Sequence, residues 1–190
     1  MLTPADYLNS LVRRESAGER VDHLYFWKAL PGPGGRPGPG CLSQWWQQPF
    51  TVDGIEYGSA EHWMMAGKAR LFGDDEALEQ ILAAEHPSLV KKLGQGVRNF
   101  DDKTWKAHRF EIVVAGNRAK FGSDPALAEY LVGTGDRVLV EASPLDRIWG
   151  IGLADDDPRA ATSSTWRGLN LLGWALMEIR TELVTAPARR

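Results

Sequence analysis

The sequence predicts an α+β fold that is mainly helical, a single domain with a few short strands. Its 190 residues are 43% hydrophobic and 25% charged, which suits one domain with a substantial core. From Ser59 onward, cap residues and prolines recur in front of stretches with helical apolar spacing. Before that point, Asp53-Gly54 stands between two short strand-like runs, the strongest short signal for a β-hairpin. These observations favour several helices packed with a small set of strands.

The N-terminal part of the chain predicts one helix, one strand, a loop and a hairpin. Thr3 can cap a helix that has Pro4 at its first position, so a short amphipathic helix is expected to about Arg14. Proline and glycine fill the segment 31–40, which predicts a flexible loop without regular structure. The expected strands are 23–27 before this loop, and 50–52 and 55–57 in the hairpin.

The rest of the chain predicts mostly helices. Ser59 is expected to cap the first of them, and Gly94 to end the third. A tail after Thr185 is predicted to be disordered. The expected helices are 59–72, 74–84, 87–94, 101–121, 124–132 and 165–183, and one further strand is expected at 137–142.

Charge and cysteine content exclude several classes of protein. The net charge of −3 argues against a general polyanion binder, but it allows a small phosphorylated ligand held by a few arginines. A single cysteine, Cys41, excludes an intrachain disulfide framework and a multi-cysteine zinc site, and fits a reducing cytoplasm. No signal peptide or membrane span is expected. The four histidines show no metal-ligand spacing, so no metal and no cofactor are expected.

The first candidate site is the helix that follows Ser59. Glu61, Met65 and Lys68 share one helical face, and their neighbours on that helix are apolar or small. An acid and an amine at the edge of a buried face are costly unless they are paired or used, which suggests a site. The alternative is that Glu61 and Lys68 belong to two unrelated surface pairs.

The second candidate is the loop from Asp146 to Gly152. Gly150 and Gly152 flank an apolar residue next to Trp149, and glycines at this spacing let a backbone approach a ligand closely. Asp146 could accept hydrogen bonds from ribose hydroxyls or stabilise a cation. The alternative for Trp149 is a packed loop anchor.

The third candidate is the segment from Trp166 to Asn170, expected at the start of the last helix. Helix N-termini bind phosphate through free N–H groups, and Arg167 would add a fork of donors. The alternative is a solvated Arg167. Arg118 and Lys120 are further cationic candidates, and the eight tryptophans suit either a core or stacking against a base.

These residues occur in an ordered series of motifs that runs from about Leu24 to Leu183. The motifs are Phe50-Thr51-Val52-Asp53-Gly54, Ser59-x-Glu61-His62-Trp63-Met64, Lys68-Ala69, Trp105, Lys120-Phe121, Asp146-x-x-Trp149-Gly150-x-Gly152 and Gly168-x-Asn170-x-x-Gly173. The series resembles the NADAR family, named for NAD and ADP-ribose, which includes YbiA-like N-glycosidases. Two features depart from the family pattern: Leu42-Ser43-Gln44 replaces Phe-Ser-Asn, and the loop 31–40 is longer than a minimal member needs. Both are expected near the substrate entrance, so they bear on the identity of the substrate rather than on the chemistry.

The resemblance implies hydrolysis of the C1′–N bond between a phosphorylated ribose or ADP-ribose and a base-like amine. Some members act on ribosylaminopyrimidine phosphates of the early riboflavin pathway, and others remove ADP-ribose from guanine, on nucleotides or nucleic acid. It implies a catalytic domain at 21–184 behind an N-terminal helix at 1–20, with a tail at 185–190. It implies Glu61, Lys68 and Asp146 as catalytic residues. The substrate-binding residues would be Trp63, Trp105, Trp149, Gly150, Gly152, Arg167 and Asn170.

Three questions stay open at the level of sequence. Either Asp146 or Glu61 could stabilise the ribosyl cation and activate water. Lys68 could attack C1′ to form an imine, or stay protonated and bind phosphate or a ribose oxygen. A noncatalytic ADP-ribose or NAD reader and a structural protein remain alternatives to an enzyme. The expected partner is the ribosyl or ADP-ribosyl substrate, with no membrane and no obligate protein partner.

Overall fold

A computed structural model describes residues 3–185 and confirms a mainly helical α+β chain. Within these residues there are seven α-helices, four short strands and four 3₁₀ turns. The chain divides into two compact units, which are described one at a time. Unit 1 takes both ends of the chain, up to Ser43 and from Ala126 onward, and unit 2 is Gln44–Pro125. The predicted tail at 186–190 lies outside the described residues.

Unit 1 is organised around two parallel strands and the last helix. Strands β1 (His23–Phe26) and β4 (Val138–Glu141) pair in register from His23 with Val138 to Phe26 with Glu141. Helix α7 (Leu171–Thr185) packs on β4 and is buried over most of its length, which explains why its sequence is apolar nearly all round. The remaining elements are α1 (Pro4–Ser16), α6 (Pro125–Val132), and the 3₁₀ turns Pro33–Gly35, Pro39–Leu42, Pro158–Ala161 and Ser163–Thr165.

The start of α1 follows the sequence prediction closely. Thr3 is the N-cap, Pro4 occupies the first helical position, and Thr3 and Asp6 form a reciprocal capping box. This pattern is local, so the sequence alone was enough to place it.

The Pro- and Gly-rich segment 31–40 differs from the prediction that it lacks regular structure. It contains one 3₁₀ turn and enters a second, and its two ends approach each other at glycines. A Cβ on Gly40 would lie 2.1 Å from the Leu30 carbonyl oxygen, and a Cβ on Gly38 would lie 3.1 Å from the Gly32 Cα. The prediction was wrong because glycine here allows backbone contact rather than disorder. Its flexibility stays a prediction.

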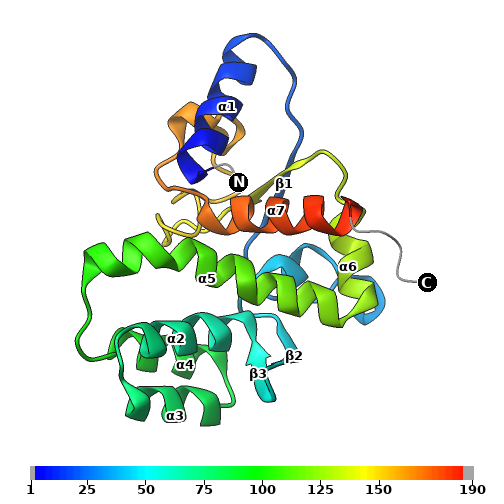
Figure 1. The fold of residues 1–190 in the computed structure, drawn as a ribbon. Helices are drawn as coiled ribbons and strands as arrows, with labels where there is room; N and C mark the ends of the chain where they lie inside the picture. The colour runs from blue at the N-terminus through cyan, green and yellow to red at the C-terminus, as the bar shows by residue number, and fades with distance from the viewer. Residues whose placement is uncertain (1–2, 186–190) are drawn as a thin grey trace. The chain divides into compact units, whose positions relative to one another are not determined.

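Unit 2 is a hairpin followed by four helices, and Figure 1 shows the cyan hairpin leading into the helices. Strands β2 (Gln47–Val52) and β3 (Ile55–Ser59) pair antiparallel, and Asp53 and Gly54 turn between them at φ 51° and 78°. Both positive φ values fit a two-residue hairpin turn, as predicted. Helix α2 (Ala60–Leu71) contacts each of the other three: α3 (Asp75–Ala83), α4 (Pro87–Gln95) and α5 (Asp102–Ser123).

Ser59 occupies the N-cap position of α2, where the sequence placed it, but its side chain makes no capping bond, because its hydroxyl bonds to Nδ1 of His62 at 2.8 Å. The predicted end of the third helix was wrong. Gly94 does not end α4, which continues to Gln95. Gly94 instead lets α4 approach α2, since a Cβ there would lie 2.0 Å from the sulfur of Met65.

The last helix starts at Leu171, six residues later than the predicted start at 165. The segment before it is held by another part of the chain: the N–H groups of Arg167, Leu169 and Asn170 donate to the carbonyls of Ile151, Arg147 and Gly150. Asn170 has φ 52°, in the left-handed region, so the helix cannot extend backward through it.

Asn170 fastens the start of α7 to strand β4. Its side-chain oxygen accepts the Glu141 N–H at 3.0 Å, and its side-chain nitrogen donates to the Leu139 carbonyl at 2.9 Å. The residue is completely buried. Both ends of the amide are therefore used in holding the fold.

We expect Asn170→Ala to lower the free energy of unfolding by about 3 kcal/mol, since it removes two buried hydrogen bonds and leaves alanine at positive φ. Asn99→Ala is the matched control, because Asn99 also has positive φ but is exposed. Its loss should be only about 1 kcal/mol. Urea unfolding of both variants measures the difference, and equal losses would show that the buried amide contributes nothing.

Candidate active site

The predicted site residues fall in both units. Glu61, Trp63, Lys68 and Trp105 belong to unit 2. Unit 1 holds the others: Asp146, Trp149, Gly150, Gly152, Arg167 and Asn170.

Glu61 is a buried carboxylate in the first turn of α2, with 3% of its surface exposed. Its backbone N–H donates to the Gln44 carbonyl at 3.0 Å. The helix N-terminus favours a negative charge at this position, which offsets part of the cost of burying it. Glu61 is therefore an interior acid of unit 2, and the alternative that it belongs to a surface pair is wrong.

Lys68 lies two turns further along α2 in an aromatic setting. Its ammonium donates to the Gly94 carbonyl at 2.7 Å and lies 4.3 Å from the ring centre of Phe100 and 5.8 Å from that of Trp105. Partial burial lowers the pKa of Lys68. No carboxylate among residues 3–185 forms an ion pair with it. The amine is thus more easily deprotonated than a surface lysine.

Trp105 and Trp63 differ in their surroundings. Trp105 starts α5, is 9% exposed and faces the Lys68 amine. Trp63 donates its indole N–H to the Ile112 carbonyl at 2.8 Å and packs against Tyr57 at 5.0 Å between ring centres. A Cβ on Gly116 would overlap its ring, so Trp63 is wedged between α2 and α5. Trp63 is half-buried and its contacts hold α2 against α5, and its substrate-binding role stays a prediction.

Sequence reasoning missed a buried polar cluster beside Glu61. Asn117 of α5 donates to the Gln44 side-chain oxygen and to the Val113 carbonyl, each at 2.9 Å. Lys120, named at the sequence level as a further cation, is completely buried three residues later, whereas Arg118 is exposed. Polar residues at helical spacing on an otherwise apolar face were the available signal.

In unit 1, Asp146 closes the predicted glycine loop. One of its carboxylate oxygens accepts the N–H groups of both Ile148 and Trp149 at 2.8 Å. Trp149 is half-buried behind this turn. Asp146 therefore shapes the loop, and its catalytic role stays a prediction.

The loop glycines allow backbone packing. A Cβ on Gly150 would lie 2.7 Å from the Glu141 carbonyl, and one on Gly168 would lie 2.3 Å from the Gly150 carbonyl. Gly152 has φ 67°, and the side chains of Arg147 and Arg167 lie over it. The close approach that the sequence suggested is made by the chain itself.

The predicted phosphate site at the last helix start does not form as expected. Arg167 and Asn170 precede the helix, and the N–H groups of Asn170, Leu171 and Leu172 already donate to Gly150, Ile148 and Trp149. A phosphate cannot use them without breaking these bonds. Arg167 itself is exposed.

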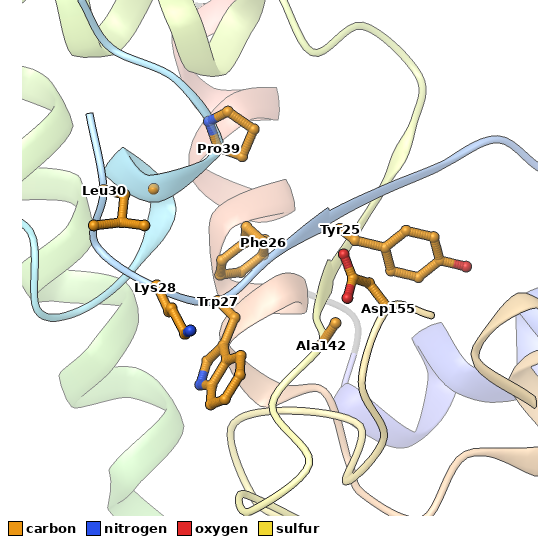
Figure 2. Close-up of a pocket in the computed structure, with 9 residues that line it drawn as sticks. Tyr25, Phe26, Trp27, Lys28, Leu30, Pro39, Ala142 and Asp155 are labelled. Atoms are coloured by element: carbon orange, nitrogen blue, oxygen red, sulfur yellow. The ribbon is translucent and has the colours of Figure 1, made fainter. Parts of the chain in front are cut away.

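Unit 1 also contains a pocket of about 420 Å³ that the sequence did not predict. Figure 2 shows Trp27 and Lys28 on one side of it and Tyr25 and Asp155 on the other, with Ala142 between. Leu30, Pro39 and Gly40 bring the ends of the Pro- and Gly-rich loop to its wall. Its volume suits a small molecule.

Within residues 3–185, no helix is both long and apolar enough to cross a bilayer. The same residues contain no group of three or more His, Cys, Asp or Glu side chains arranged to hold a metal ion.

The sequence matches one family model and several known proteins. The family model for the NADAR domain matches residues 25–184. An N-glycosidase of Acanthamoeba polyphaga mimivirus is 44% identical over 146 residues, 74% of this chain and 86% of that protein. A riboflavin biosynthesis protein of Vibrio vulnificus is 31% identical over 144 residues, 76% of this chain but only 35% of that protein.

A solved structure agrees with these matches. The NMR structure of the Escherichia coli protein YbiA superposes with a TM-score of 0.69 and 25% identity, covering 87% of each chain. That protein is named an N-glycosidase. The fold agrees with the family match, and the chain belongs to the NADAR family.

Proposed function

We propose that this protein is an N-glycosyl hydrolase that cleaves the C1′–N bond between a phosphorylated ribose or ADP-ribose and a base-like amine. The observation that carries the proposal is the presence on one helix, two turns apart, of a buried acid, Glu61, and a part-buried amine, Lys68. Relatives named N-glycosidases support the reaction class.

The environment of Lys68 suits a nucleophile. A neutral amine keeps one lone pair while an N–H donates to the Gly94 carbonyl, so this hydrogen bond does not block attack. Burial lowers the pKa and increases the share of neutral amine near neutral pH. The amine also lies over the rings of Phe100 and Trp105, which offer it no negative charge.

The proposed reaction has two stages. The Lys68 nitrogen attacks C1′, the C1′–N bond breaks, and the base leaves with its electron pair and gains a proton. The sugar ring opens to an imine between Lys68 and C1′. Water then adds to C1′, the C1′–Lys68 bond breaks, and the free sugar leaves while Lys68 is restored. The amine gives up two protons, one to the departing base and one to the ring oxygen, and the two protons of the water later restore the amine. Glu61 carries these protons one at a time and passes each on through water, because it lies two turns of α2 away from Lys68.

Two substrates fit the proposal. One is a ribosylaminopyrimidine phosphate of the riboflavin pathway, which the name of the Vibrio vulnificus relative supports. The other is ADP-ribosylated guanine, as a nucleotide or within nucleic acid. Incubation with each, followed by mass spectrometry, separates them, because release of ribose 5-phosphate identifies the first and release of ADP-ribose the second. Binding of ADP-ribose without turnover of either would contradict an enzyme and leave a reader module.

Borohydride added during turnover should reduce the imine and leave the sugar attached to Lys68. Peptide mass spectrometry locates the adduct. Lys68→Met should abolish it and lower kcat by a factor of about 10³ or more, while Lys92→Met, which removes an exposed lysine of α4, should change neither. Turnover with no adduct would rule out the covalent role.

Glu61→Gln should lower kcat by a factor of about 10² to 10⁴ with little change in KM, because the amide cannot take up a proton. Glu79→Gln, an exposed residue of α3, is the matched control. Circular dichroism checks that both variants fold. Unchanged kcat in folded Glu61→Gln would assign proton transfer to another group.

The pH dependence of kcat/KM distinguishes the two roles of Lys68. A nucleophilic amine becomes active as it loses its proton, so the rate should rise with pH and level off at an apparent pKa below the ordinary lysine value. A cation that only binds phosphate would be lost over the same range, so the rate would fall. A falling profile would therefore contradict the nucleophilic role.

A further inference from the structure

The Lys68 amine lies against the ring of Phe100, a residue of the segment between α4 and α5. The amine nitrogen is 4.3 Å from the centre of this ring, compared with 5.8 Å from that of Trp105. A water molecule does not fit between the amine and the Phe100 ring, since its hydrogen bond to the amine would alone take up about 2.9 Å. Phe100 therefore screens one side of the amine, although 45% of its own surface is exposed.

The backbone that carries Phe100 is held at both ends. On one side, the backbone N–H and the guanidinium of Arg98 donate to the buried carboxylate of Asp74 at 2.8 and 2.6 Å. On the other side, Asp101 caps α5. Asn99 has φ 56°, in the left-handed region, and turns the chain directly before Phe100. The position of the ring is therefore fixed by the backbone of the segment.

The ring of Phe100 also packs against the helix that carries the amine. Phe72 lies at the C-terminal end of α2, one turn after Lys68, and meets Phe100 edge to face at 5.3 Å between ring centres. Phe100 is thus in contact with two side chains of α2, and one of them is the lysine.

Charged groups do not account for the state of the amine. Within residues 3–185, no carboxylate forms an ion pair with Lys68, and burial is the cause of its lowered pKa. The charged and titratable residues on α2 and on the elements around it near Lys68 are Glu61 on α2, Glu76 on α3, Lys91 on α4, Arg98 and Asp101 in the segment between α4 and α5, and His108 and Arg109 on α5.

The ring of Phe100 has two opposing effects on the amine. Its apolar body keeps water away, which favours the neutral amine, whereas its π face attracts the charged ammonium. The attraction is weak where the ring is partly exposed to water. We therefore expect the screening to be the larger effect.

We propose that Phe100 is a positioning residue for Lys68: its ring holds the amine at the Gly94 carbonyl and keeps water from it, so that the amine gives up its proton more readily. The use of this amine as a nucleophile rests on the proposed function. The effect of the ring on Lys68 needs no substrate.

An NMR titration of the whole protein tests the inference. The Cε signal of Lys68 in isotope-labelled protein, assigned with Lys68→Met, reports the pKa of the amine. Phe100→Ala removes the screen, so the pKa should move back toward the ordinary lysine value and the share of neutral amine near neutral pH should fall by a factor of about 3 to 10. Phe100→Leu keeps an apolar side chain but loses the π face, so this share should stay the same or increase.

Leu89→Ala is the matched control and should leave the titration unchanged. Leu89 is an apolar residue of α4 with nearly the same exposed fraction as Phe100, 47%, and it lies on a different side of that helix from Gly94. Circular dichroism checks that each variant folds.

The outcomes separate this inference from the proposed function. If Lys68 is the nucleophile, the rise of kcat/KM with pH should move to higher pH in Phe100→Ala by as much as the NMR pKa moves. An NMR shift that the rate profile does not follow supports the role of Phe100 and contradicts the nucleophile.

An unchanged or lower pKa of Lys68 in folded Phe100→Ala overturns the inference and leaves the hydrolase to the borohydride test. A rise in Phe100→Leu as large as that in Phe100→Ala also overturns it, because an apolar side chain of similar size would then not screen the amine.

Discussion

The organisation of unit 1 depends on direct contact between two backbone segments, Arg147–Leu153 and Arg167–Leu172. The contact is possible because Gly150 and Gly168 have no side chain to keep the segments apart. Several consequences follow from it. The first N–H groups of α7 find their acceptors in the loop, the helix begins late, and Asn170 adopts a positive φ that directs its amide to β4. The glycine motif, which in the sequence suggests ligand binding, therefore has a structural role in unit 1: it lets the two segments satisfy each other's backbone hydrogen bonds.

In unit 2, glycines likewise allow close backbone packing, here between the helices that surround Lys68. Gly94 and Gly116 bring α4 and α5 close to α2 at Met65 and Trp63. The closeness of α4 places the Gly94 carbonyl within 2.7 Å of the Lys68 nitrogen. Partial removal from water lowers the pKa of this amine, and its hydrogen-bond partner is a neutral carbonyl, whereas a carboxylate at the same place would raise the pKa. The packing of the helices and the reactivity of the lysine thus have a common origin.

The sequence was sufficient where the signal is local. The Thr3 cap with Pro4 behind it and the Asp53-Gly54 turn depend on residues within four positions of one another. It failed where a distant segment decides. Ser59 bonds to His62 instead of capping α2, and the start of α7 depends on a loop about twenty residues earlier.

The candidate site shows the same division. The types and order of the residues indicated Glu61 and Lys68. They did not indicate that Glu61 is almost fully buried or that Phe100 lies next to the Lys68 amine. The pocket around Trp27 was not predicted because its lining comes from segments more than a hundred residues apart, such as Tyr25 and Ala142, which only the parallel pairing of β1 and β4 brings together. Parallel pairing over such a separation leaves no mark in a short window of sequence.

The closed neck of the loop 31–40, where its two ends approach each other at glycines, has a consequence for how this part of the chain can change. Its tip, Pro33–Arg36, is exposed, whereas Gly38 and Gly40 at the neck are buried. Insertions and deletions at the tip should therefore leave the pocket wall that Leu30 and Pro39 form in place. We therefore expect the tip to accept a grafted peptide or label without disturbing the wall that Leu30 and Pro39 form.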